Sequence, residues 1–475
     1  MATTFYFDSK VLFVSNSSTR RAKAITGLIV VGCGVAVGPL DTAVNIAFPA
    51  IIGEFQLPLE MIQWIIICYV LTYSSLTLIA GKLGDRYGRR RIFKIGLAAS
   101  CIGLAACSLA PSFGALLPAR VAQGLGTALA IACGPALATS LYPESLRSRV
   151  IGYYAAMFAA AGAIGPVIGG ALTDAFGWQA VFWFRIPLAL TVLGLLWTLP
   201  SDRNHRDLET SFDFLGAILL VATLASFALA LSLARWGLTV EAICVGFLGF
   251  VSAVFFVRVE KTASDPVLQI RAFQNVRFCL LNVLNIIICG ATFTPLLFTP
   301  FFLTRHAGFD AASGGLALAI GALGAAIAAA LAGRMIERIS GATVAVFGAS
   351  LAALGLGLIG QVQTDATLAE VILTLAIAGV GLGLFQTAYL DGVTSILPEK
   401  DRGVAGGLAM VTRTIGVIAA ASMLTLLFSH VQKSALQNDL GAADAFLQGY
   451  NTVFLVAAAS AFAGATLAWS FRRFS

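Results

Sequence analysis

The stretch LIAGKLGDRYGRRRIFKIGL, residues 78–97, is a strongly charged segment in a mostly apolar chain. It combines a run of Lys and Arg with a single carboxylate, Asp85. The residues on either side, 61–80 and 95–110, are almost uncharged. A helix needs about 20 apolar residues to cross a bilayer core of roughly 30 Å. The stretch therefore predicts a basic loop between two membrane-spanning helices, with one acid whose role needs an explanation.

The composition of the whole chain agrees with a membrane location. Hydrophobic residues make up 59% of the 475 residues, charged residues only 11%, and the mean hydropathy is +0.90. Soluble domains contain about one quarter charged residues. A membrane barrel would show short alternating segments, whereas the apolar segments here are long and continuous. The sequence predicts an all-α integral membrane protein.

Apolar segments of spanning length recur from end to end, and we expect fourteen transmembrane helices. They lie at 24–50, 61–80, 93–111, 116–141, 150–173, 179–199, 213–233, 239–257, 277–303, 313–332, 342–360, 367–390, 403–429 and 447–471. The remaining residues leave no room for a sizeable soluble domain.

The distribution of charge predicts the orientation. If the first helix crosses from inside to outside, most Lys and Arg fall in cytoplasmic segments, and this asymmetry is typical of cytoplasmic loops. We therefore expect a multi-pass protein of the plasma (inner) membrane with both termini in the cytoplasm. The same asymmetry explains the net charge of +7 without a nucleic-acid partner.

The sequence offers little support for metal, cofactor or ATP chemistry. All eight cysteines fall inside predicted spans without CxxC spacing, and the three histidines lie in separate predicted loops. A Walker-type phosphate loop is absent from the sequence. We expect neither a cofactor nor a metal site, and we do not expect an enzyme.

An internal repeat divides the chain. GKLGDRYG at 81–88 aligns with GRMIERIS at 333–340, and SLYPESLRSRVIG at 140–152 aligns with SILPEKDRGVAGG at 395–407. The offsets, 252 and 255 residues, exceed half of a twelve-helix chain, so two helices must be inserted between the copies. We expect a tail at 1–23, a six-helix bundle at 24–200, a cytoplasmic linker with two inserted helices at 201–258, a second linker at 259–276 and a six-helix bundle at 277–475. Parallel repeats of this kind are a known plan for alternating-access carriers.

Four motifs on these predicted helices resemble the major facilitator superfamily, in particular its fourteen-helix branch of drug:proton antiporters. The loop motif uses Gly81, Leu83, Asp85, Arg86, Gly88 and Arg89, and the fourth-helix motif uses Leu116, Arg120, Gln123, Gly124 and Gly126. The first-helix motif keeps Asp41, Asn45 and Pro49 but has Ala43 and Phe48 where Thr and Leu are usual. The fifth-helix antiporter motif keeps Gly152, Gly165, Pro166, Gly169 and Gly170, with Ala161 in place of a Gly. The resemblance implies export of substrate against protons.

Asp41 and Arg120 are the candidates for proton coupling. An ionised carboxylate near the middle of a span costs at least about 2.5 kcal/mol, so Asp41 should be protonated or paired. Arg120 cannot lose its proton and can only modulate an acid or bind an anion. The resemblance assigns Arg120 either to proton transfer or to helix packing. For both residues a purely structural ion pair is the alternative.

Two further groups are expected to act in the conformational change. Asp85 should meet Arg89, Glu144 and Arg147 at the cytoplasmic side, together with Gly81 and Arg86, and the resemblance adds that Asp85 caps the thirteenth helix near Gly403. This would form a latch between the halves. The glycines of the fifth-helix motif and Pro166 should form a tight seam that seals the cavity. Ordinary small-residue packing is the alternative.

Polar and aromatic residues on the same helices are candidates for the substrate cavity. They are Asn45, Tyr69, Met157, Phe158, Asn282, Asn285, Gln386, Tyr389, Asp391 and Arg413. We expect Asp391 and Arg413 to be buried or half-buried. Arg185 stands where the family usually has Asn; it either faces this cavity or extends to an interface. The surplus of arginines counts against a purely cation-selective pocket.

These observations predict a proton-coupled exporter of lipophilic, cationic or neutral small molecules that works as a monomer in the lipid bilayer. Two alternatives remain open. One is an exporter of anionic amphiphiles such as fatty acids, lipids or siderophores. The other is a transporter-like sensor or scaffold without transport activity.

Overall fold

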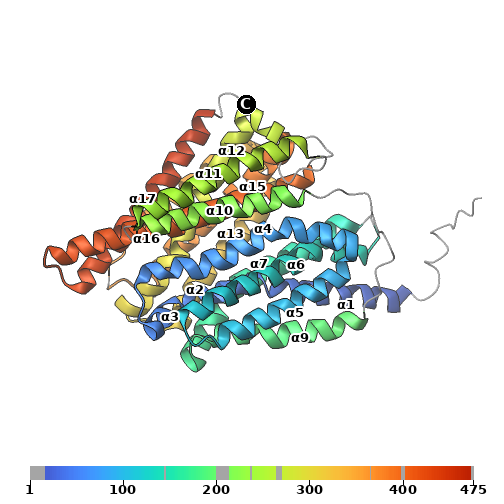
Figure 1. Ribbon diagram of the computed structural model, residues 1–475, viewed down its shortest axis with the longest axis horizontal. Helices are drawn as coiled ribbons and strands as arrows, with labels where there is room; N and C mark the ends of the chain where they lie inside the picture. The colour runs from blue at the N-terminus through green and yellow to red at the C-terminus, as the bar shows by residue number, and fades with distance from the viewer. Residues whose placement is uncertain are drawn as a thin grey trace, which may run out of the picture.

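A computed structural model describes residues 17–143, 146–198, 213–235, 238–263, 270–363, 365–396 and 402–471. Helices account for the regular structure in these ranges, and no strand occurs in them. Figure 1 shows long helices running side by side in two groups that lie at an angle to each other. The all-α prediction is therefore confirmed.

The first group contains the amino-terminal helices. It comprises α1 (Ser17–Ala36), η2 (Pro39–Thr42), α2 (Ala43–Ile46), α3 (Phe48–Phe55), η3 (Leu59–Met61), α4 (Ile62–Tyr87), α5 (Arg89–Ser108), α6 (Phe113–Ser140), α7 (Arg147–Phe176), α8 (Ala180–Trp183), α9 (Arg185–Leu195) and η5 (Leu196–Thr198).

The second group contains the carboxy-terminal helices. It comprises η6 (Ile270–Gln274), α12 (Val276–Phe301), the π-helical turn η7 (Phe302–His306), α13 (Ala311–Ile339), α14 (Gly341–Ile359), α15 (Leu368–Ile396), α16 (Arg402–Gln437) and α17 (Ala442–Phe471). Between the groups in sequence, α10 (Phe214–Arg235) and α11 (Thr239–Thr262) pack on each other, and α10 contacts α4 and α16. We call the two groups the N bundle and the C bundle.

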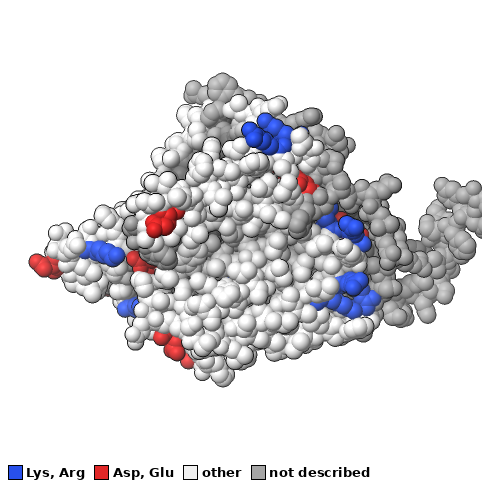
Figure 2. Space-filling view, viewed as in Figure 1, with Lys and Arg blue, Asp and Glu red and all other residues white. Residues whose placement is uncertain are grey.

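Twelve helices in the described part of the chain are long and apolar enough to cross a membrane. Two shorter apolar helices, Ala180–Leu195 and Ile218–Phe227, coincide with the expected spans at 179–199 and 213–233. Figure 2 shows a broad area around the centre of the visible face without Lys, Arg, Asp or Glu, with the charged residues lying toward its margins. The protein is therefore a multi-pass membrane protein, while the expected count of fourteen spans stays a prediction.

One end of the molecule is strongly basic. There α4 ends and α5 begins, and this turn contains Arg86, Arg89, Arg90 and Arg91. The turn is tight because Gly88 takes a positive φ of 98°, which side chains rarely adopt. We call this end the basic end, and the other end the distal end.

The first membrane helix is interrupted rather than continuous. α1 ends at Ala36, and a 3₁₀ turn beginning at Pro39 leads into the short helix α2. Proline has no N–H to continue the hydrogen-bond ladder, so an interruption at this position follows from its chemistry. Asp41 belongs to this turn. A membrane span is therefore present where 24–50 was expected, at Ile25–Ile46, but its helix is not continuous, and the interruption determines where the acid lies.

Candidate functional site

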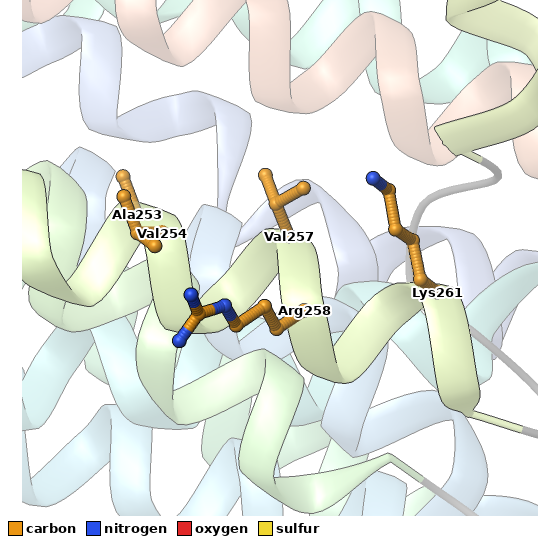
Figure 3. Close-up of a pocket in the computed structure, with 5 residues that line it drawn as sticks. All are labelled: Ala253, Val254, Val257, Arg258 and Lys261. Atoms are coloured by element: carbon orange, nitrogen blue, oxygen red, sulfur yellow. The ribbon is translucent and has the colours of Figure 1, made fainter.

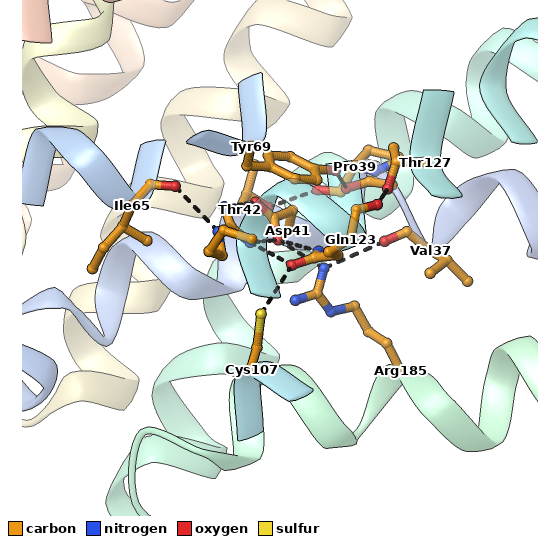
Figure 4. Close-up of polar contacts among 12 residues, drawn as sticks. Val37, Pro39, Asp41, Thr42, Ile65, Tyr69, Cys107, Gln123, Thr127 and Arg185 are labelled. Carbon is orange, nitrogen blue, oxygen red and sulfur yellow. Dashed lines mark hydrogen bonds and ion pairs between the residues drawn. The ribbon is translucent and has the colours of Figure 1, made fainter. Parts of the chain in front are cut away.

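Asp41 is the centre of a buried charge cluster in the N bundle (Figure 4). Arg120 from α6 binds both carboxylate oxygens: its Nη1 lies 2.7 Å from Oδ1 and its Nη2 lies 2.7 Å from Oδ2. Gln123, one turn further along α6, donates to Oδ1 at 2.9 Å. Arg185, at the start of α9, donates from Nη1 to the same oxygen at 2.9 Å. The candidates Asp41 and Arg120 are thus brought together.

The cluster is enclosed by aromatic rings and backbone. Arg120 also donates from Nε to the carbonyl of Ile65 at 3.1 Å, and its guanidinium lies 4.3 Å from the centre of the Tyr69 ring. Such cation–π contacts stabilise a buried guanidinium. Tyr69 itself donates to the carbonyl of Gly38, at the helix interruption. Arg120 is 2% exposed and Arg185 is fully buried, whereas 11% of the Asp41 side chain is accessible.

Arg185 therefore does not extend to a membrane interface. Its guanidinium lies between Asp41 and the rings of Phe182 and Phe184, each 5.9 Å away. Of the two positions that the sequence allowed, the structure places Arg185 inside the N bundle. The cluster consequently contains two guanidinium groups and one carboxylate.

The other N-bundle candidates lie close to the interrupted helix. Asn45 is buried on α2. Met157 on α7 packs so closely on Gly32 of α1 that a Cβ atom there would overlap its side chain. Phe158, the next residue, is partly buried against the core. Asn45 therefore follows Asp41 on the interrupted segment, whereas Met157 contacts α1 before the interruption.

The fifth-helix glycines lie at two helix contacts. Gly165 and Gly169 pack against the η2–α2 segment, where the Thr42 hydroxyl and the Ala43 backbone occupy the space that a Cβ would need. Gly170 instead packs against the backbone of Ala311 in α13, and Gly315 of α13 packs against Pro166. The second contact joins the N bundle to the C bundle. Gly152, by contrast, has open space around it.

The α7–α13 contact also includes a charged cap that sequence reasoning did not identify. Asp174 near the end of α7 accepts hydrogen bonds from the amides of Ala311 and Ala312, at 3.2 and 2.9 Å. These are the first two residues of α13, whose own cap Asp310 accepts from Ser313 at 2.9 Å. A carboxylate at a helix N-terminus is stabilised by the exposed amides and the helix dipole. Asp174 therefore links the two bundles at the distal end.

A second, uncharged network occupies the C bundle. Asn285 on α12 donates to the Thr412 hydroxyl at 2.7 Å and accepts from Gln386 on α15 at 2.9 Å. Tyr389 donates to Asn282 at 3.0 Å. Four of the cavity candidates thus converge from α12 and α15. Thr412 of α16 joins them, and sequence reasoning did not include it because a lone threonine in an apolar helix carries no distinct signal.

Asp391 and Arg413 differ from the sequence-based expectation. Both side chains are exposed rather than buried or half-buried. Asp391 lies beside Gly341, at the beginning of α14. Arg413 nevertheless lies within electrostatic range of Cys289, whose thiol contacts Asn285 and Gln386 of the network.

At the basic end, Asp85 forms an ion pair with Arg89, four residues along, at 2.8 Å. Both side chains are partly accessible, Asp85 to 38% and Arg89 to 45%. Gly81 has open space around it, and Arg86 lies over the ring of Tyr87. Glu144 and the side chain of Arg147 lie outside the described residues. The latch proposed for these residues stays a prediction.

A surface pocket of about 350 Å³ lies elsewhere, on α11 (Figure 3). It is lined by Ala253, Val254, Val257, Arg258 and Lys261. All five residues come from one helix outside the two bundles, so this pocket is distinct from both buried networks. In the ranges that the structure describes, no group of three His, Cys, Asp or Glu side chains could hold a metal ion.

Two helical bundles with a membrane-buried ion cluster next to an interrupted helix are the arrangement of a secondary membrane transporter. Comparison with known families specifies the class. The family model described as Major Facilitator Superfamily matches residues 27–421 and 285–473, and the chain belongs to this superfamily. The protein is thus a membrane transporter of small-molecule substrates and not an enzyme.

Named relatives cover most of the chain. It is 31% identical over 395 residues to the "Multidrug resistance protein Stp" of Mycobacterium tuberculosis, covering 82% of this chain and 73% of that protein. It is 29% identical over 421 residues to the "Tetracenomycin C resistance and export protein" of Streptomyces glaucescens, covering 87% and 77%. It is 24% identical over 453 residues to the "Riboflavin transporter RibZ" of Clostridioides difficile, covering 94% and 97%.

Solved structures share the fold at low identity. A bacterial homologue of the human lysosomal transporter Spinster, in an inward-facing and occupied conformation, superposes with a TM-score of 0.70. It is 17% identical, and the match covers 96% of this chain and 98% of the other. The POT family transporter PepTSo gives a TM-score of 0.67 at 14% identity, covering 95% of this chain and 99% of the other.

Proposed function

We propose that this protein is a proton-coupled secondary transporter that exports lipophilic small molecules from the cell by alternating access. The relatives named for multidrug resistance and export support the direction and the substrate range. The observation that carries the proposal is the carboxylate of Asp41, buried at a helix interruption and shared by two arginines. Membrane-buried acids with such partners are typical of proton relays.

The orientation follows from the distribution of charge. Cytoplasmic loops are enriched in Lys and Arg, so the basic end of the N bundle faces the cytoplasm. Both chain termini then lie in the cytoplasm, the membrane is the inner membrane, and the two shorter apolar helices complete fourteen spans. A monomer contains both bundles and can alternate on its own.

The contacts between the bundles indicate which state the structure represents. Arg305 donates to the carbonyl of Pro49 at 2.7 Å, and Asp174 caps α13, both at the distal end. Near the middle, the hydroxyls of Thr414 and Ser74 are 2.7 Å apart. Gly81 and Gly152, toward the basic end, have open space around them. The arrangement supports an inward-facing state that is closed at the distal end.

Alternating access gives each buried network a role. Asp41 takes up a proton from the outside and releases it to the cytoplasm, and its ion pairs form again on release. The neutral network of Asn285, Gln386 and Tyr389 provides hydrogen bonds for the substrate. Tight packing of α7 on α13 prevents water from passing through the distal end in this state.

Proteoliposomes with an imposed pH gradient test the proposal. Addition of a transported compound should dissipate the gradient, while Asp41→Asn should insert and fold but lose proton-coupled transport. Substrate binding should persist in this variant, because the C-bundle network is unchanged. If no compound in a broad panel dissipates the gradient or accumulates in the vesicles, proton-coupled export is wrong. Normal binding without flux would instead support a sensor or scaffold.

A further inference from the structure

The ion cluster of the N bundle contains more positive than negative charge. Arg120 and Arg185 remain protonated at any relevant pH, and Asp41 is the acid that pairs with both. Two other acids are buried in the described part of the chain, Glu60 and Glu260, but they lie on η3 and α11. With Asp41 ionised, the cluster therefore has one excess positive charge.

The two arginines are satisfied to different degrees. Arg120 uses Nε, Nη1 and Nη2 in hydrogen bonds to Ile65, Gln123 and Asp41. Arg185 uses Nη1 alone, toward Asp41 and, at 3.4 Å, the carbonyl of Val37. Its Nε and Nη2 atoms are buried and have no hydrogen-bond partner among the described residues. In Figure 4 this part of the guanidinium points away from Asp41.

Unpaired charged donors inside a protein are rare and unfavourable. The open edge of a guanidinium presents parallel N–H groups that match the two oxygens of a carboxylate. A cationic ligand would find the opposite situation, since both oxygens of Asp41 already accept from arginine. The geometry therefore favours an acceptor with negative charge and disfavours a cation.

We propose that Arg185 sets the charge preference of the transporter. The transported compound bears an anionic oxygen group, a carboxylate or phenolate, that pairs with Nε and Nη2 of Arg185, and cations bind poorly. The proposal rests on the proposed transport function and specifies its substrate class. Arg185 is fully buried in this state and Asp41 is the partly accessible member of the cluster, so the proposal requires the cluster to open when the anion binds. Because proton and anion bind different atoms, their exchange depends on the alternation of conformations rather than on competition.

Two dyes with the same xanthene core test the charge preference. Fluorescein is anionic and rhodamine 6G is cationic, and their binding to the full-length protein can be measured by fluorescence anisotropy without a gradient. The wild type should bind fluorescein more tightly. Arg185→Gln should weaken fluorescein binding by about tenfold, as expected for the loss of a charged hydrogen-bonded pair, and should strengthen rhodamine binding.

Asp41→Asn distinguishes anion binding by Arg185 from a merely structural role of this arginine. This variant removes the negative charge, so the excess positive charge rises and fluorescein should bind several-fold more tightly than to the wild type. Arg185→Lys keeps the charge but loses the planar fork; it should retain the preference with reduced affinity. Both variants remain informative if Arg185→Gln does not fold. Arg258→Gln, on α11, is the matched control and should change neither dye.

The outcomes separate this inference from the proposed function. A wild type that prefers rhodamine, that binds neither dye, or whose Arg185→Gln variant changes both dyes equally overturns the charge preference. Dye flux is measured separately, in proteoliposomes with a pH gradient. Intact fluorescein preference without flux of either dye would contradict proton-coupled export while the charge preference stands.

Discussion

At the residue scale, the two arginines around Asp41 differ in what they contribute to stability. Removing either arginine leaves Asp41 paired with the other, so the cost depends on the hydrogen bonds that are lost, and a hydrogen bond to a charged group contributes about 1.5–3 kcal/mol. Arg120 provides the bidentate pair, and Arg185 adds a second cation to an acid already paired. The consequences of removing them should therefore differ.

We expect Arg120→Gln to lower the melting temperature strongly and Arg185→Gln to lower it little. Either substitution removes the excess positive charge. Asp41 then keeps one hydrogen bond from Arg185 in the first variant and two from Arg120 in the second. Thermal unfolding in detergent, followed by tryptophan fluorescence, measures the difference. Equal destabilisation by the two substitutions would show that the arginines are equivalent.

How far these residues could be predicted depends on the kind of signal. Asp41 and Arg120 stand out because charges within an apolar segment are conspicuous. The position of Arg185 could not be predicted, since its direction depends on where α9 begins and how it is rotated in the bundle. Asp391 and Arg413 were expected to be buried or half-buried because they lie within apolar segments. Both are exposed, because the packing of the bundle decides which side of a helix is covered by its neighbours.

At the element scale, the cap on α13 is the feature that connects the bundles most directly. Asp174 and Asp310 both accept from the first turn of this helix, but only Asp174 belongs to the N bundle. A helix cap of this type contributes about 0.5–2 kcal/mol. The loss of Asp174 should therefore favour states in which the distal end is open.

Asp174→Ala should increase the outward-open population several-fold, because about 1 kcal/mol changes a two-state equilibrium by about fivefold. Spin labels on α7 and α13 would measure the distance distribution across the distal end by pulsed electron resonance. Asp310→Ala is the matched control, since it removes a cap on the same helix without breaking a contact between bundles. A similar shift in both variants would indicate a general weakening of α13.

The elements themselves were largely predictable because apolar segments of spanning length are a strong signal. Helices occupy the described part of every expected span. The interruption of the first helix was missed, although Pro39 is a local signal for it. The cap by Asp174 lacks any such signal, because its partner lies more than a hundred residues away and is identified only by the packing of α7 on α13.

At the scale of the whole molecule, each end of the transporter has an acidic residue whose contacts differ in this structure. Asp174 links the bundles at the distal end, whereas Asp85 at the basic end pairs locally with Arg89. A latch that favours the outward-facing state should be released in a structure closed at the distal end. In this structure the side chain of Asp85 is 38% accessible and pairs with Arg89, and the latch stays a prediction.

Asp85→Asn should reduce the transport rate while leaving substrate affinity within a few-fold of the wild type. In the expected latch Asp85 caps the N-terminus of α16, and a carboxylate in such a position contributes about 0.3–1 kcal/mol, which changes the balance of two states but not the binding site. Parallel measurements of flux and equilibrium binding test this. A large loss of affinity would place Asp85 in the binding site instead.

The excess positive charge next to Asp41 should make the transporter sensitive to voltage. One elementary charge that crosses the whole membrane field gains about 2.3 kcal/mol per 100 mV, so a displacement through a fifth of the field is worth about 0.5 kcal/mol. A negative potential in the cytoplasm would attract the cluster and favour one of the two states. Distal distances measured in vesicles with a potassium diffusion potential should shift with its sign in the wild type and shift less in Arg185→Gln. The membrane potential, as well as the pH gradient, would then help to drive each cycle.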